Sequence, residues 1–169
     1  MKKILVTALF SCLFVLAGFS QTSLKVGASV PPFSAAGLDG TQYDLNELRG
    51  SVVVLTFWST RCYICQHEFP KMNQVVRSFD GRPVVFLSLT MENETKVESF
   101  LKSNQIAATV VPNSFGVLLQ YADRDKRGYL DMGFPSYFVI DKQGVLQYRA
   151  SGYDRTGPLS SAVGELVSK

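Results

Sequence analysis

The sequence predicts an α/β fold in which a mixed central sheet carries helices on both faces. Apolar runs that are typical of buried strands alternate with segments whose apolar residues recur at helical spacing. Near the carboxyl end, strand-like runs at 137–140 and 145–149 flank an Asp-Lys-Gln-Gly turn and precede a final helix. Strand–helix–strand units followed by such a hairpin give one sheet with strands in both directions.

The segment before the first buried strand is expected to form a small hairpin. Asp39-Gly40 is a two-residue turn signal between the extended segments 33–38 and 41–45. Residues 45–50 resemble a single helical turn that ends at glycine, the residue favoured just past a helix. We therefore expect a β-hairpin in addition to the central sheet.

A buried strand and a long helix follow. Residues 52–58 are almost entirely apolar, which is typical of a strand buried on both faces. The spacing of the next apolar residues predicts a helix that begins near Cys62, with Ser59 or Thr60 as its N-cap. Pro70 lies inside this helix and is expected to kink it, because proline lacks the backbone N–H that a helix needs.

The rest of the chain supplies the other strands and helices. The same patterns predict strands at 84–89 and 109–111, and helices at 93–103, 115–121 and 159–167. No internal repeat or low-complexity tract interrupts this order. The 169 residues therefore fit one globular domain.

The amino terminus has the pattern of a secretory signal. Two lysines precede an apolar stretch that runs to Phe19, and small residues favour cleavage after Ser20. We expect a signal peptide at 1–20, with an uncleaved membrane anchor as the alternative, and a mature domain at 21–169. The protein is therefore expected to be exported to the periplasm or another extracytoplasmic compartment.

A Cys-x-x-Cys pair is the motif that carries chemistry. Cys62 and Cys65 stand at the predicted helix start, where free backbone N–H groups and the helix dipole favour a thiolate. Cys62 is therefore the expected attacking thiolate and Cys65 the resolving thiol. A structural disulfide and a zinc site completed by carboxylates are the alternatives. His67, the only histidine, is expected to be an exposed bystander.

Several short motifs occur together in an order that resembles one family. They are Val26-Gly27 with Pro32-Phe33, Leu38-Asp39-Gly40, Leu48-Arg49-Gly50, Phe57-Trp58, Cys-x-x-Cys, Glu68-x-Pro70, and Gly133-Phe134-Pro135-Ser136 before Tyr137-Phe138-Val139-Ile140-Asp141. The chain is similar to the extracytoplasmic thiol–disulfide oxidoreductases of the TlpA/ResA type. The resemblance covers most of the mature chain, and it implies a thioredoxin-like fold with an added amino-terminal β-hairpin.

The resemblance also implies roles for particular residues. It implies a cis bond between Phe134 and Pro135, facing the cysteine pair, with the backbone before the proline available to an extended substrate. It implies that Glu68 accepts the proton of Cys65 during resolution; a solvated glutamate on the helix face is the alternative. Trp58 is expected to pack beside the pair.

The chain departs from the family pattern in two places. Arg61 stands where the family usually has a tryptophan, directly before the first cysteine. Its charge is expected to stabilise the Cys62 thiolate; a solvent-facing cap residue is the alternative. The charged segment 122–131 is an addition, expected to be a solvated loop or, alternatively, to border the substrate groove.

These observations favour an enzyme that exchanges its dithiol with the disulfides of substrate proteins, mainly as a reductant. Apocytochrome c is the family's best-known substrate, and a membrane protein of the thiol-reducing type would return the electrons. We expect a monomer that needs no cofactor or metal. A disulfide oxidase or isomerase is the alternative, because Cys-x-x-Cys proteins span about −270 to −120 mV.

Other functional classes are disfavoured. A peroxiredoxin has threonine and proline where this chain has Ser59 and Leu55. A copper-binding module would need a distant histidine, and His67 is too close to the pair. The formal net charge is +3, and two of these charges belong to the leader, so nothing favours nucleic acid as a partner.

Overall fold

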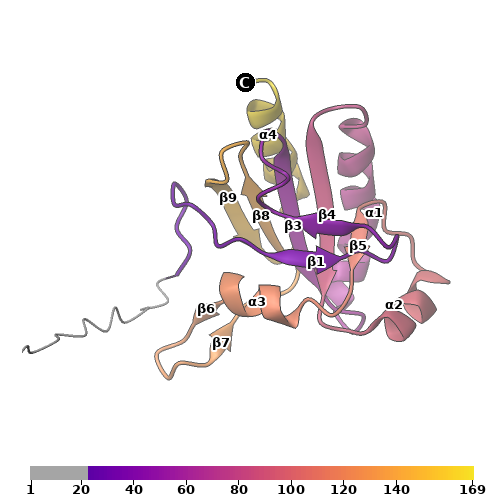
Figure 1. The fold of residues 1–169 in the computed structure, drawn as a ribbon. Coiled ribbons are helices and arrows are strands. Elements are labelled where there is room, and N and C mark those ends of the chain that lie inside the picture. Colours follow the sequence, from indigo (N-terminus) through magenta and orange to yellow (C-terminus); the bar gives the residue numbers. More distant parts are fainter. Residues whose placement is uncertain (1–22) are drawn as a thin grey trace, which may run out of the picture.

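The central sheet is mixed, as the sequence predicts. The computed structural model describes residues 23–169, so the expected signal peptide lies outside the described residues. The strands lie in the order β5-β4-β3-β8-β9 (Figure 1). They comprise β3 (Val52–Trp58), β4 (Val84–Thr90), β5 (Thr109–Val111), β8 (Ser136–Ile140) and β9 (Leu146–Ser151). β3 pairs parallel to β4 on one side and antiparallel to β8 on the other.

Alternate residues of β3 face two apolar layers. Val53, Leu55 and Phe57 join a cluster that includes α3 (Phe115–Tyr121) and the amino-terminal segment. Val52 and Val54 join a second cluster on the other face, formed with α1 (Tyr63–Ser78) and α4 (Thr156–Val167). The period of two along a strand produces this division. Helices therefore cover both faces of the sheet.

The end of β3 enters a third apolar cluster. Trp58 is fully buried there with Cys65, Phe69, and Val97 of α2 (Glu94–Leu101). The cluster lies at the carboxyl ends of the parallel strands, where the chain turns into α1. α1 continues across Pro70, where the expected kink remains a prediction.

The amino-terminal hairpin is present, with a longer connection than the sequence indicated. β1 (Ser34–Ala36) and β2 (Gln42–Asp44) are antiparallel and are separated by residues 37–41. The prediction of a two-residue turn was therefore wrong. The Asp39 carboxylate accepts the Thr41 N–H at 3.0 Å, and Gly40 has a φ of +78°, a conformation that glycine adopts without strain.

The charged segment 122–131 is a second small hairpin and not only a solvated loop. β6 (Asp123–Arg124) pairs antiparallel with β7 (Leu130–Asp131). The Asp125 carboxylate accepts the N–H groups of Arg127 and Tyr129 at 2.8 and 3.0 Å. In Figure 1 this hairpin projects below α3.

Among residues 23–169, no helix is long and apolar enough to cross a bilayer.

Candidate functional site

The two cysteines stand at the start of α1. Cys62 is the N-cap residue, and its Sγ accepts the N–H of Cys65 at 3.1 Å. The two residues form a disulfide, with 5.2 Å between their Cα atoms. Cys62 is partly exposed, whereas Cys65 is 1% exposed. A partner can therefore approach Cys62 more readily than Cys65.

The expected N-cap at Ser59 or Thr60 was wrong, because both hydroxyl groups bind Glu92 instead. Glu92 Oε1 accepts hydrogen bonds from Ser59 Oγ at 2.8 Å and from Thr60 Oγ1 at 3.0 Å. It also accepts the Thr60 N–H at 3.2 Å, and Glu92 Oε2 accepts from the Thr90 hydroxyl. The Ser59 carbonyl in turn accepts the N–H of Cys62 at 3.0 Å. Glu92 thus fixes the segment that leads into the cysteine pair.

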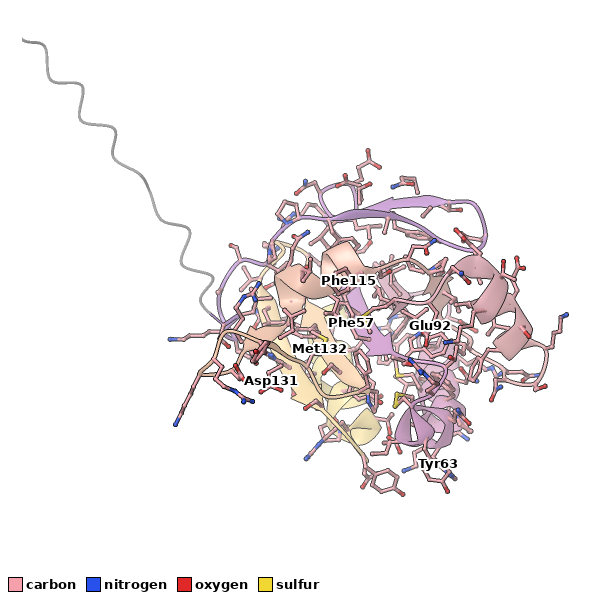
Figure 2. The ribbon with its side chains drawn as sticks, turned by 90° about the horizontal axis from the view of Figure 1, so that it is seen from below. Phe57, Tyr63, Glu92, Phe115, Asp131 and Met132 are labelled. Carbon is pink, nitrogen blue, oxygen red and sulfur yellow. A yellow bond between two sulfur atoms is a disulfide. The ribbon has the colours of Figure 1, made fainter. Side chains whose placement is uncertain are left out.

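The environment of Glu92 favours its ionised form. Burial alone would raise the pKa of this carboxyl group, but hydrogen bonds from Thr90, Ser59 and Thr60 outweigh burial and lower it to about 2. Lys96 adds a positive charge 3.5 Å away. In Figure 2 the disulfide lies between Glu92 and Tyr63.

The proline segment packs against the apolar cluster that contains Cys65. The Phe134–Pro135 peptide bond is cis, which confirms that prediction. Phe134 is partly buried and packs against the cluster of Trp58 and Cys65, as does Cys62. Trp58 therefore packs beside the pair, as expected. Its Nε1 is buried, and among residues 23–169 it has no hydrogen-bond partner.

Glu68 is buried and is not the solvated glutamate of the alternative interpretation. It lies one turn after Cys65, and its side chain is 2% exposed. Its Oε1 is 3.4 Å from Lys71 Nζ, and its Oε2 accepts the backbone N–H of Asp154 at 3.2 Å. The carboxylate therefore contacts both α1 and the loop between β9 and α4.

Two other residues singled out in the sequence lie at the surface. Arg61 is exposed directly before Cys62. His67 is exposed and packs edge-on against Tyr63, with 4.3 Å between the ring centroids. In residues 23–169 no cluster of three or more His, Cys, Asp or Glu side chains could hold a metal ion.

A polar groove of about 330 Å³ borders the proline segment. Residues on both sides of Pro135 line it together with both strands of the β6–β7 hairpin; the lining residues are Asp123, Asp131, Met132, Gly133, Ser136, Arg149, Ala150 and Ser151. The added hairpin is therefore next to the proline segment. Figure 2 shows Asp131 and Met132 together at this edge of the molecule.

Comparison with known proteins places this geometry in a family. The model of the AhpC/TSA family matches residues 26–149. The chain belongs to the AhpC/TSA family. The chain is similar to the thiol-disulfide oxidoreductase ResA of Geobacillus thermodenitrificans. The two are 28% identical over 133 residues, which cover 78% of this chain and 72% of the relative. The thioredoxin-like protein YneN of Bacillus subtilis is 28% identical over 131 residues, with 75% and 72% covered.

Solved structures show the same fold. A thiol:disulfide interchange protein of the thioredoxin family from Chlorobium tepidum superposes with a TM-score of 0.69 at 22% identity, covering 86% of this chain and 99% of that chain. The thioredoxin domain of a Bacteroides vulgatus thiol-disulfide oxidoreductase gives 0.69 at 19% identity, with 86% and 99% covered. This AhpC/TSA family member therefore has the thioredoxin-like fold that the sequence motifs implied.

Sequence reasoning missed Glu92 and Lys71. Glu92 lies two residues after the end of β4, and the ends of adjacent parallel strands meet at one sheet edge, so a carboxylate there was a usable signal. Lys71 stands three residues after Glu68, a spacing that brings side chains together on a helix. Its second partner, Asp154, is remote in sequence and gave no such signal.

Proposed function

We propose that this AhpC/TSA family member is an extracytoplasmic thiol–disulfide oxidoreductase that reduces disulfides in substrate proteins. The observation that carries the proposal is the cysteine pair at the helix start, with Cys62 partly exposed and Cys65 buried in the apolar cluster against which Phe134 packs. Relatives named as thiol-disulfide oxidoreductases support this class of activity. The leader pattern at 1–20 supports export.

The reaction consists of two exchanges. The Cys62 thiolate attacks one sulfur of the substrate disulfide, so a mixed disulfide forms and one substrate thiolate leaves. Cys65 then loses its proton to Glu68 and attacks the Cys62 sulfur. This step releases the second substrate thiolate and leaves the Cys62–Cys65 disulfide, so two electrons have passed to the substrate.

The surrounding residues serve binding and reactivity. The backbone at Phe134, before Pro135, forms hydrogen bonds with an extended substrate segment. Trp58 packs in the same cluster as Cys65 and supports the cysteine pair. Arg61 stabilises the attacking thiolate by its charge. We do not propose peroxide reduction, because this chain lacks the proline and threonine of a peroxiredoxin. Leu55, at the proline position, is buried in the core, and Ser59, at the threonine position, donates its hydroxyl to Glu92.

The reaction needs a source of electrons outside the cytosol. A membrane protein of the thiol-reducing type would reduce the Cys62–Cys65 disulfide again after each turnover, since cytosolic thioredoxin does not reach an exported protein. Substrates are proteins with accessible disulfides, and apocytochrome c is the first to test. No cofactor takes part, because the cysteine pair itself carries the electrons.

The redox potential of the pair tests the direction of electron flow. Equilibration with glutathione buffers, followed by thiol trapping, should give about −250 mV or lower, as for thioredoxin. A value above about −150 mV would contradict the reductant assignment and indicate an oxidase.

Trapping experiments test the division between the two cysteines. Cys65→Ser should accumulate a mixed disulfide through Cys62, because attack proceeds and resolution cannot. Cys62→Ser should form no adduct, since the buried Cys65 is not accessible. Mass spectrometry of each variant after reaction with a disulfide-bonded peptide is the measurement. Adducts on Cys62→Ser alone would reverse the assignment.

A further inference from the structure

Within residues 23–169, the cationic side chain in contact with the buried Glu68 carboxylate is Lys71. Among the described residues, the hydrogen bonds to Glu68 come from Lys71 at one carboxylate oxygen and from the Asp154 backbone at the other. Burial and then the charge of Glu68 raise the pKa of the phenol of Tyr137 on β8. Tyr137 therefore also lies near Glu68. These groups approach Glu68 from α1, from the loop after β9, and from the sheet.

Lys71 is itself held in place by that loop. Its ammonium is 3.0 Å from Asp154 Oδ1 and lies 4.8 Å from the centroid of the Tyr153 ring. The hydrogen bond to Asp154 is the main cause that raises the pKa of Lys71, so the side chain stays charged. A cation in contact with both Asp154 and Glu68 has a defined position although its side chain is 43% exposed.

The same loop reaches the proline segment. Gly152 donates its N–H to the carbonyl oxygen of Pro135 at 2.8 Å. Asp154 has a φ of +57°, a conformation that aspartate adopts more readily than most residues. The loop residues 152–154 therefore contact Pro135 at one end and both Glu68 and Lys71 at the other.

We propose that Lys71 is a positioning residue that holds the Glu68 carboxylate in place and supplies its counter-charge for proton transfer from Cys65. The inference rests on the proposed role of Glu68. A carboxylate acts as a general base only in its ionised form, and a cation in contact with it favours that form over the protonated one.

The two exchange steps can be followed separately with 5,5′-dithiobis(2-nitrobenzoic acid). Attack by Cys62 of the reduced full-length chain releases a first coloured thiolate, and resolution by Cys65 releases a second. Stopped-flow absorbance between about pH 4 and pH 8 gives the pH profile of each phase. In wild type, the second phase should slow as the pH falls.

Lys71→Met should shift the acid midpoint of the second phase upward by about 0.5–1 pH unit. An adjacent opposite charge shifts such equilibria by about 1–3 units, and the exposure of Lys71 reduces this effect. Lys71→Arg retains the charge and should restore the wild-type midpoint. Lys102→Met, a change at an exposed lysine just after the end of α2, controls for the change in net charge. The first phase should change little in all three variants.

Glu68→Gln separates this inference from the proposed function. If Glu68→Gln abolishes the acid midpoint while Lys71→Met leaves it unmoved, the role of Lys71 is wrong and the role of Glu68 stands. If Glu68→Gln leaves the second phase unchanged, the proposed role of Glu68 is wrong and that of Lys71 falls with it. A purely structural Lys71 would lower stability without moving the midpoint.

Discussion

At the scale of single residues, two carboxylates bind the chain segments that come before and after the redox pair. Glu92 fixes the segment before Cys62, and Glu68 connects the helix after Cys65 to the loop at Asp154. Both form hydrogen bonds to backbone N–H groups, which set the path of the chain as well as the positions of side chains. A change at either carboxylate should therefore affect both stability and thiol chemistry.

Replacing Glu92 with glutamine should destabilise the protein in a pH-dependent way. The pKa of Glu92 is lowered from 4.5 to about 2 on folding, so its ionised form stabilises the protein above about pH 4.5. That contribution is lost as the pH falls through about 2. Glu92→Gln should therefore lower the free energy of unfolding at pH 7 by about 1–3 kcal/mol, and by less at pH 3.

Urea titrations at the two pH values measure this difference. Glu98 is an exposed glutamate on α2, six residues after Glu92. Glu98→Gln is therefore the matched control and should change stability by less than about 0.5 kcal/mol. An equal loss at pH 7 and pH 3 for Glu92→Gln would show that its charge is not the stabilising feature.

At the scale of elements, the β6–β7 hairpin depends on its turn. Asp125→Ala removes the acceptor of two backbone N–H groups and should make residues 124–127 several-fold more sensitive to trypsin. Asp125→Asn retains an acceptor oxygen and should be cleaved at nearly the wild-type rate. The free energy of unfolding should fall by about 1 kcal/mol or less. Peptide mapping after timed digestion measures the cleavage.

A second readout distinguishes a local effect from a general one. Because the hairpin lies beside the groove and not in the core of the sheet, the first-phase reaction of Cys62 with a small disulfide should be unchanged in Asp125→Ala. A slower first phase would mean that the hairpin supports the cysteine pair directly.

The sequence predicted the elements whose signals are local. The apolar run of β3, the helical spacing of α1 and the Cys-x-x-Cys placement each lie within a few residues, and each is present at nearly the expected position. The cap was misassigned because the competing partner of Ser59, Glu92, is 33 residues away. Hydrogen bonds between remote segments leave no periodic pattern in the chain.

The β6–β7 hairpin was missed for a related reason. Each strand has two residues, too few to show an alternating pattern. Arg149, 26 residues away on β9, donates to Asp123 at 3.0 Å and so attaches the hairpin to the sheet. Asp123 looked solvated in the sequence because its partner lies in another element. The Asp-Lys-Arg-Gly turn at 125–128 was the available signal.

At the scale of the whole molecule, β3 joins the core to the chemistry. Its alternate residues enter the two layers on either face, and Trp58 at its end enters the cluster with Cys65. A register shift of one residue would exchange the two layers, because side chains alternate along a strand. The same shift would move Trp58 away from the pair. The site can therefore form only when β3 pairs in the correct register.

This sharing limits where the protein tolerates redesign. An engineer who wanted a different client protein could not relocate the cysteine pair, because its address is set by the strand that holds the core together. The adjustable parts are the surfaces that border the proline segment without belonging to that strand, namely the β6–β7 hairpin and the loop at 152–154. Natural diversification of such a scaffold faces the same constraint, so new preferences would be expected to arise in these two borders while the centre stays as it is.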